Sequence, residues 1–179
     1  MRRIELLGME VENFRSFREP TVLSFEGGIG LNYLTGDNQV EPLLDGNGAG
    51  KSTIWDALLF VISGTSVRGL RASDLVTWGG SRPCVTSIWK IGEDLVSITR
   101  QGSPNKLTIN DIPAEQKEVD TLLGLTRLQF LHSVVFGQAC PLFPDLSLPE
   151  RAELVDNILN LDVWLKAAEH AGKEHTRLQ

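Results

Sequence analysis

The sequence has few cysteines and no long hydrophobic run. Its two cysteines, Cys84 and Cys140, lie far apart and form no C-x-x-C pair, which argues against a disulfide framework or a zinc site. No stretch approaches the ~20 consecutive apolar residues that a membrane-spanning helix needs. There is also no internal repeat and no low-complexity tract. We therefore expect two buried thiols in a protein of the reducing cytoplasm that does not enter the membrane.

An excess of positive charge is also missing. The 179 residues carry 17 Lys and Arg against 23 Asp and Glu, a net charge of −6, which argues against a uniformly basic protein that wraps nucleic acid. A local basic patch is still compatible with this balance. With 41% hydrophobic residues, the chain can bury one core and form one domain with a lobe-like extension.

The pattern of apolar residues predicts an α/β fold. The helix that begins at Lys51 is expected to end at Gly64. Short β-branched runs separated by turn residues predict an antiparallel meander over residues 84–112. Further strands and helices are expected from alternating and helical patterns: strands at 4–14, 21–25, 28–35 and 133–138, and helices at 113–132, from Ser147 and from Asp162.

The segment "NGAGKST", residues 47–53, is typical of a phosphate-binding loop. Its glycines allow backbone amides to surround phosphate oxygens, and the helix that follows points its positive end at them. Lys51 neutralises phosphate charge and Ser52 can ligate Mg²⁺. The alternative is a turn that happens to carry these letters before a helix. The expected nucleotide-binding residues of the loop are Gly36, Asn47, Gly48, Ala49, Gly50, Lys51, Ser52 and Thr53.

The loop departs from the standard G-x-x-x-x-G-K-[ST] spacing, because Asp45 stands where the first glycine belongs. Removing residues 39–46 and keeping only one of the flanking asparagines, Asn38 or Asn47, restores the spacing and makes Gly36 that first glycine. We interpret these residues as an insertion, with Gly36 or Gly46 supplying the turn. Asp45 is expected to face away from the phosphates, which would repel its charge. The insertion is either part of the site or a tolerated surface loop.

Four separated segments resemble the N-terminal lobe of the SMC-like DNA-repair ATPases, most closely the SbcC type: "ENFRSF", "NGAGKSTIWDALLFVISG", "FGQ" and "LSLPERAELVDNILNLDVW". The resemblance implies a P-loop NTPase fold of the ABC-ATPase head type. An N-terminal lobe at residues 1–161 would be followed by the root of a coiled coil at 162–179. The meander is less specific to this family, and the family normally has no insertion in the loop.

The resemblance also implies roles for four further residues. Gln138 matches the glutamine that senses Mg²⁺ and the attacking water, so it is the expected catalytic residue and second metal ligand. Arg15 matches an arginine near the nucleotide, while Arg68 and Arg71 match a segment near the nucleotide and the DNA-facing surface. The alternative for Gln138 is a loop residue that satisfies backbone groups. For Arg15 the alternative is a surface ion pair, and for Arg68 and Arg71 it is two solvated side chains.

In that family, the N-terminal lobe and a C-terminal lobe form one head, and two heads enclose two ATP molecules. The implied cofactors are ATP and Mg²⁺. The implied partners are the C-terminal lobe, a second head in an ATP-dependent dimer, an SbcD-type nuclease and double-stranded DNA. The implied function is to couple ATP binding and hydrolysis to the processing of DNA double-strand breaks.

The sequence contains no apolar strand ending in Asp-Glu and no "SGG" signature. We therefore expect either an N-terminal fragment or a protein that works with a second polypeptide, and negligible hydrolysis by this chain alone. A self-contained small P-loop kinase or GTPase is one alternative, although N-K-x-D is also absent. A DNA-binding scaffold that binds nucleotide without hydrolysing it is another.

Overall fold

A computed structural model of the chain describes residues 3–28, 30–38, 46, 48–135, 142–159 and 162–178. It divides into two compact units, residues 1–127 and 128–179, and each is described by itself. The expected boundary between a lobe at 1–161 and a coiled-coil root at 162–179 stays a prediction. The α/β class expected from the sequence is confirmed.

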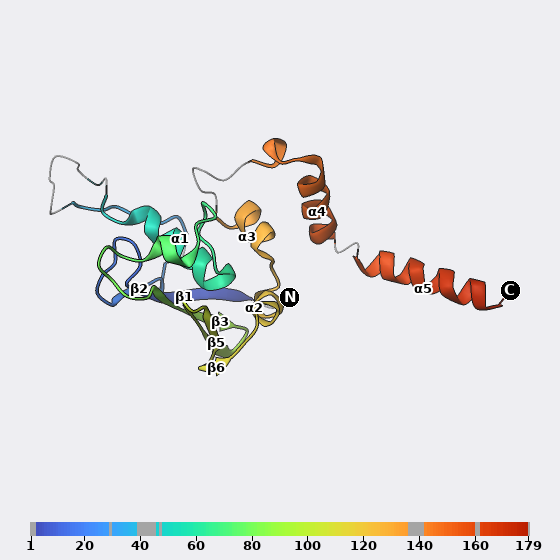
Figure 1. The fold of residues 1–179 in the computed structure, drawn as a ribbon, viewed down its shortest axis with the longest axis horizontal. Helices are drawn as coiled ribbons and strands as arrows, with labels where there is room; N and C mark the ends of the chain where they lie inside the picture. Colours follow the sequence, from blue (N-terminus) through green and yellow to red (C-terminus); the bar gives the residue numbers. More distant parts are fainter. Residues whose placement is uncertain are drawn as a thin grey trace. The chain divides into compact units, whose positions relative to one another are not determined.

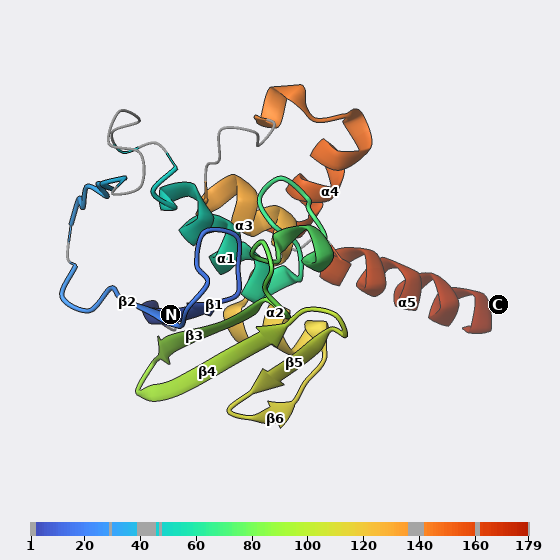
Figure 2. The same ribbon diagram turned by 60° about the vertical axis from the view of Figure 1, so that its left-hand side comes forward.

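The first unit contains an antiparallel sheet with the strand order β2-β1-β3-β4-β5-β6. Strand β1 pairs with the sequence-distant β3 along its whole length, from Ile4 opposite Ile91 to Glu12 opposite Cys84. Strands β3 to β6 follow one another with short turns, so the expected meander is confirmed (Figure 2). The strands are β1 (Ile4–Glu12), β2 (Thr21–Ser24), β3 (Cys84–Ile91), β4 (Asp94–Gln101), β5 (Lys106–Ile109) and β6 (Ile112–Pro113).

Helix α1 (Lys51–Ser63) packs against β3 and β4 on one face of this sheet (Figure 1). It ends as expected at Gly64, which adopts a left-handed conformation and donates its N–H to the Phe60 carbonyl at 2.8 Å. In the sequence, Ile54, Leu58, Val61 and Ile62 predict one apolar stripe along this helix, but every residue from Ala57 to Ile62 is buried. Helix α1 is therefore a core helix, and its burial holds the phosphate loop against the sheet.

Arg100 on β4 fixes the carboxyl end of α1. Its side chain is buried and donates to the carbonyls of Val61 at 3.1 Å and Ile62 at 3.3 Å. Gln116, at the start of α2 (Gln116–Leu123), accepts from Arg100 at 2.6 Å and donates to Ile62 at 2.8 Å. A cation at this end complements the helix dipole. Burial lowers the pKa of Arg100 to about 10, so the guanidinium stays charged at neutral pH.

The second unit is helical where the structure describes it. Its elements are η3 (Phe143–Asp145), α4 (Leu148–Leu159) and α5 (Asp162–Leu178), and α3 (Arg127–Ser133) begins at the boundary between the units. The expected helix start at Ser147 is confirmed, because its N–H and hydroxyl both donate to Glu150. These two hydrogen bonds lower the pKa of the Glu150 carboxyl.

Three local expectations differ from the structure. Residues 28 and 30–35 form no strand, because no described strand lies beside them to complete a ladder. The helical region at 113–132 is two helices, α2 and α3, because Gly124 ends α2 in a left-handed conformation. Of the strand expected at 133–138, Ser133 ends α3 and residues 134–135 are irregular. Residues 136–138 lie outside the described part of the chain.

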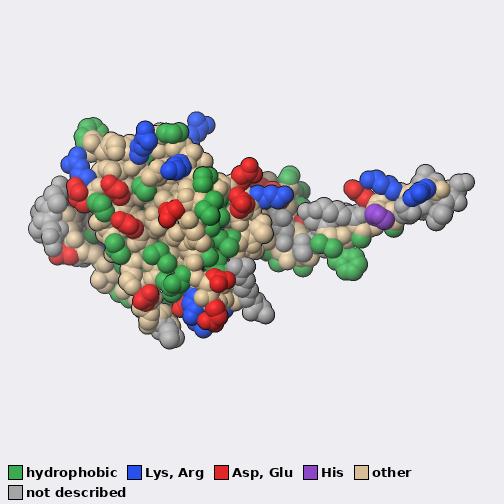
Figure 3. Space-filling view, turned by 90° about the horizontal axis from the view of Figure 1, so that it is seen from below, with side chains coloured by type: hydrophobic (Ala, Val, Ile, Leu, Met, Phe, Trp, Pro, Cys, Tyr) green, Lys and Arg blue, Asp and Glu red, His purple; other side chains and the backbone are tan. Residues whose placement is uncertain are grey.

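The exposed surface carries mixed side chains. Seen from below, the body that contains the sheet shows hydrophobic side chains scattered among charged ones (Figure 3). Cys84 is half-buried, and burial raises the pKa of its thiol. Cys140 lies outside the described residues. Among the described helices, none is both long and apolar enough to cross a membrane.

Candidate nucleotide-binding site

The phosphate loop predicted from the sequence leads into the amino end of α1. Gly50 is the N-cap residue with φ 85°, and Gly48 has φ 78°, both in the left-handed region that glycine adopts readily. Gly50 brings no side chain to the cap, so the first amides of α1 are left for a ligand. With the positive end of the helix dipole, they form an environment that favours an anion.

A hollow of about 230 Å³ opens at this amino end. The backbone glycines contribute its floor, and Lys51 contributes the fixed positive charge that the sequence predicts. Ser52 is exposed, so its hydroxyl is available to a ligand. The hollow is lined by Arg15, Ser16, Gly46, Gly48, Ala49, Gly50, Lys51, Ser52 and Thr53. The size, the charge and the exposed amides suit phosphate groups.

Gly46 and Gly36 pack closely beside Lys51. The ammonium of Lys51 donates a hydrogen bond to the Gly46 carbonyl. A Cβ on Gly46 would lie 2.7 Å from both the Lys51 ammonium and the Gly36 carbonyl, and a Cβ on Gly36 would lie 2.7 Å from the Ala49 Cβ. Both glycines suggested by the sequence therefore lie at the loop, and neither has space for a side chain. Asn47 and Asp45 lie outside the described residues.

Arg15 reaches the hollow from a tight turn after β1. Phe14 and Phe17 exchange backbone hydrogen bonds of 2.8 and 2.9 Å, which places Arg15 and Ser16 at the tip. Arg15 has φ 49°, and its N–H donates to the Leu75 carbonyl at 2.8 Å. Phe14 is fully buried, with its ring 5.4 Å from that of Phe60 in α1. The turn is thus anchored in the core beneath the phosphate loop.

The side chain of Arg15 forms an ion pair, the alternative named for it above, but its partner is a buried aspartate that we did not predict from the sequence. Its Nη1 donates to Oδ2 of Asp56 in α1 at 2.8 Å. The Asp56 side chain is 4% exposed, while that of Arg15 is 31% exposed. The other carboxylate oxygen, Oδ1, accepts from the backbone N–H of Val67 at 3.0 Å. The signal in the sequence was an acid within the apolar run of "STIWDALLF", since a buried carboxylate needs partners.

Among the remaining predicted site residues that the structure describes, none lines the hollow. Arg68 and Arg71 are exposed beside Val67 and do not line it. Gln138 lies outside the described residues, so its expected role as the catalytic and metal-sensing residue stays a prediction. No group of three or more His, Cys, Asp or Glu side chains that could hold a metal ion occurs among the described residues. The exposed Ser52 hydroxyl fits Mg²⁺, a cation that prefers oxygen ligands and retains waters.

The fold is of the α/β class, and the hollow at the amino end of α1 is its candidate nucleotide-binding site. A family model described as an AAA domain matches residues 9–139. The chain therefore belongs to this AAA-domain family, and the matched residues include those that line the hollow and most of the sheet that supports it.

Curated relatives include two kinds of DNA-associated protein. The chromosome partition protein Smc of Thermoplasma acidophilum is 31% identical over 168 residues, covering 86% of this chain. Exonuclease subunit 2 of Enterobacteria phage T4 is 29% identical over 128 residues, covering 64% of this chain. The chain spans only 14% of the Smc protein and 23% of the phage protein. The resemblance to SMC-like ATPases is confirmed in this coarser form, whereas the SbcC type is not.

Two solved structures are similar to this chain at lower sequence identity. RecF bound to ATP, described as a recombination mediator protein, has a TM-score of 0.48 at 17% identity, covering 66% of this chain and 31% of that one. The SMC head domain from Thermotoga maritima has a TM-score of 0.44 at 19% identity, covering 65% of this chain and 41% of that one. Both TM-scores lie below 0.5, so neither structure defines the fold of this chain.

Proposed function

We propose that this chain is the ATP-binding half of an SMC-like ATPase head of the SbcC type. The observation that carries the proposal is the hollow at the amino end of α1, where Lys51, Ser52 and Arg15 meet. Membership of the AAA-domain family and the similarity to Smc and to a phage exonuclease subunit support the same class. In this proposal, ATP binding and hydrolysis are coupled to double-strand-break processing.

The residues of the hollow have distinct roles in binding ATP. The amides of the loop donate to phosphate oxygens, and Lys51 exchanges the Gly46 carbonyl for a phosphate oxygen. The Ser52 hydroxyl would ligate Mg²⁺, which offsets negative charge between phosphate groups when it is bound. Gln138 is proposed to sense that metal and the attacking water.

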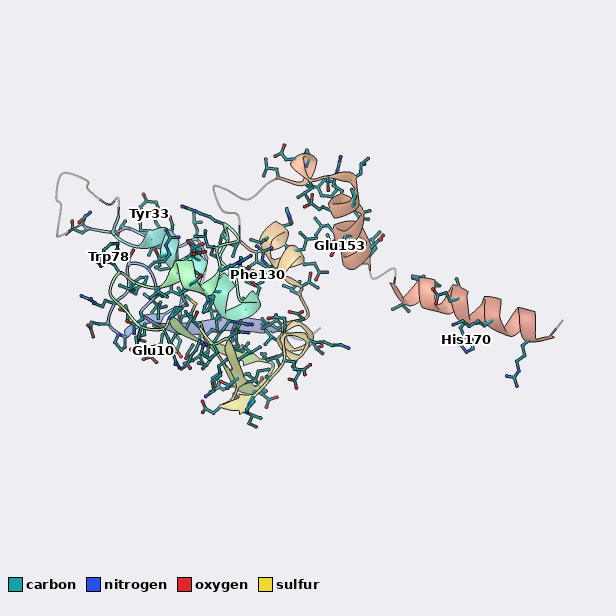
Figure 4. All side chains as sticks on the ribbon, viewed as in Figure 1. Glu10, Tyr33, Trp78, Phe130, Glu153 and His170 are labelled. Carbon is teal, nitrogen blue, oxygen red and sulfur yellow. The ribbon has the colours of Figure 1, made fainter. Side chains whose placement is uncertain are left out.

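The exposed apolar residues before the phosphate loop support the proposal of a second lobe. Leu31 and Tyr33 are almost fully exposed, and Leu34 is 44% exposed, although they lead directly into the loop (Figure 4). In P-loop folds a strand occupies this position, and parallel strands are apolar on both faces. We propose that a C-terminal lobe supplies the neighbouring strands, and with them the catalytic carboxylate that the described residues do not place at the hollow.

Three further partners belong to this proposal. A second head would close over the nucleotide in an ATP-dependent dimer. The name of the phage T4 relative, exonuclease subunit 2, favours a nuclease of the SbcD type as a partner. Arg68 and Arg71 are exposed on one short segment, where they could contact phosphates of double-stranded DNA. The root of a coiled coil is proposed at α5.

Calorimetry of ATP binding tests the central proposal. We expect Lys51→Ala to weaken ATP binding by roughly ten- to hundredfold, the range for a hydrogen bond to a charged group. Lys106→Ala, which removes an exposed lysine on β5 outside the hollow, is the matched control. Equal affinities of the wild type and the Lys51 variant would refute the assignment of the phosphate loop.

Turnover measurements separate the alternatives. We expect negligible ATP hydrolysis by the 179-residue chain and Mg²⁺-dependent hydrolysis after a C-terminal lobe is added. Hydrolysis by the chain alone that Lys51→Ala abolishes would favour a self-contained P-loop enzyme. ATP binding without hydrolysis in either preparation would favour a nucleotide-dependent scaffold.

A further inference from the structure

The geometry points to Asp56 as the residue that positions Arg15 at the phosphate hollow. This inference rests on the proposed function, because it assigns a role in ATP binding to a side chain outside the hollow. Arg15 lines the hollow, whereas Asp56 does not. The only carboxylate oxygen that Asp56 offers to Arg15 is Oδ2, at 2.8 Å from Nη1.

Arg15 is held at both ends. Its backbone lies in the tight turn between Phe14 and Phe17, with its N–H on the Leu75 carbonyl. Its guanidinium is held by Asp56, which stands one turn into α1 from the phosphate loop. An arginine carries five N–H donors in a planar fork. The bond to Asp56 uses one of them and restrains the guanidinium beside the hollow, so the remaining donors can meet a phosphate at a smaller cost in conformational entropy.

Asp56 is itself rigidly placed. It is 3% exposed, and Ile54 and Ala57 on either side of it in α1 are buried. The bond from the Val67 N–H to Oδ1 fixes the orientation of the carboxylate. If the Asp56 side chain rotated away from Arg15, its negative charge would be left buried without a cation, which is energetically costly. A surface ion pair would not hold an arginine in this way.

The test is a double-mutant cycle on ATP affinity, with wild type, Asp56→Asn, Arg15→Gln and the double variant. Asparagine keeps an oxygen for the Val67 N–H but removes the charge that holds Arg15. We expect Asp56→Asn to weaken ATP binding roughly two- to tenfold, the range of one hydrogen bond. In the Arg15→Gln background the same change should have no further effect. Double-mutant cycles isolate such a dependence.

Each outcome decides the inference. A loss that is equal in both backgrounds would show that Asp56 only supports the fold, and tighter binding would show that Asp56 competes with phosphate for Arg15. Unchanged affinity in Arg15→Gln would show that Arg15 does not reach the nucleotide. The Lys51→Ala variant, measured in parallel, identifies failure of the proposed function itself. A second double-mutant cycle, on the free energy of urea unfolding of the same four proteins without nucleotide, verifies the ion pair between Arg15 and Asp56.

Discussion

Replacing Arg100 with methionine tests whether the carboxyl end of α1 depends on a buried arginine. Methionine fills similar space but donates no hydrogen bond. The Val61 carbonyl then loses its contact with Arg100, while the Ile62 carbonyl keeps the Gln116 donor. An orphaned buried carbonyl costs about 1–3 kcal/mol, and the lost charged bond to Gln116 costs about as much.

Part of this loss is offset, because the methionine carries no charge that must be desolvated. The lowered pKa of Arg100 has burial as its main cause, which shows that desolvation is substantial. We therefore expect the free energy of unfolding to fall by about 3 kcal/mol. For a chain of this size, that corresponds to roughly 6–12 °C in Tm.

Urea unfolding followed by circular dichroism measures this loss, and Arg82→Met serves as the control at an exposed arginine. The control should change the stability by less than about 0.5 kcal/mol. A loss below about 1 kcal/mol for Arg100→Met would refute the reasoning, because it would mean that water or another donor satisfies the end of α1.

Two further predictions concern the start of α4 and the phosphate loop. Hydrogen bonds from Ser147 lower the pKa of the Glu150 carboxyl in the folded state. The contribution of Glu150 to stability is therefore present above the pKa of the unfolded state, and it is lost as the pH falls through the lower pKa of the folded state. An NMR titration of the Glu150 carboxyl should show this, and Glu150→Gln should remove the pH dependence of α4; a midpoint at or above 4.5 would contradict it. Gly46→Val should weaken ATP binding roughly five- to hundredfold by overpacking, because a Cβ there would lie 2.7 Å from the Lys51 ammonium. Gly172→Ala in α5, where the added Cβ would meet no further heavy atom within 4 Å, is the control, and calorimetry showing equal affinities would place the nucleotide elsewhere.

Much of the first unit could be predicted because the signals are local. The glycines and Lys51 of the phosphate loop, the end of α1 at Gly64 and the meander each depend on residues close together in the chain. Turn residues and β-branched runs define hairpins over short distances. The capping of α4 by Ser147 and Glu150 is likewise a contact over three residues.

The errors arose where a distant partner decides the structure. The alternating segment before the loop has the composition of a strand, but a strand needs a neighbour to bond with, and none is described beside it. The apolar stripe predicted for α1 underestimated its burial, because a helical pattern in sequence does not show how many elements cover the helix.

The sequence by itself predicted the phosphate loop at the amino end of α1, because this order of glycines, lysine and serine is typical of a backbone that surrounds anions. Only the tertiary structure decided which distant side chains complete the site. Arg15 and Asp56 are 41 residues apart, and Arg100 lies 38 residues beyond Ile62. Buried charges select their partners by proximity in space, which no spacing in the sequence records.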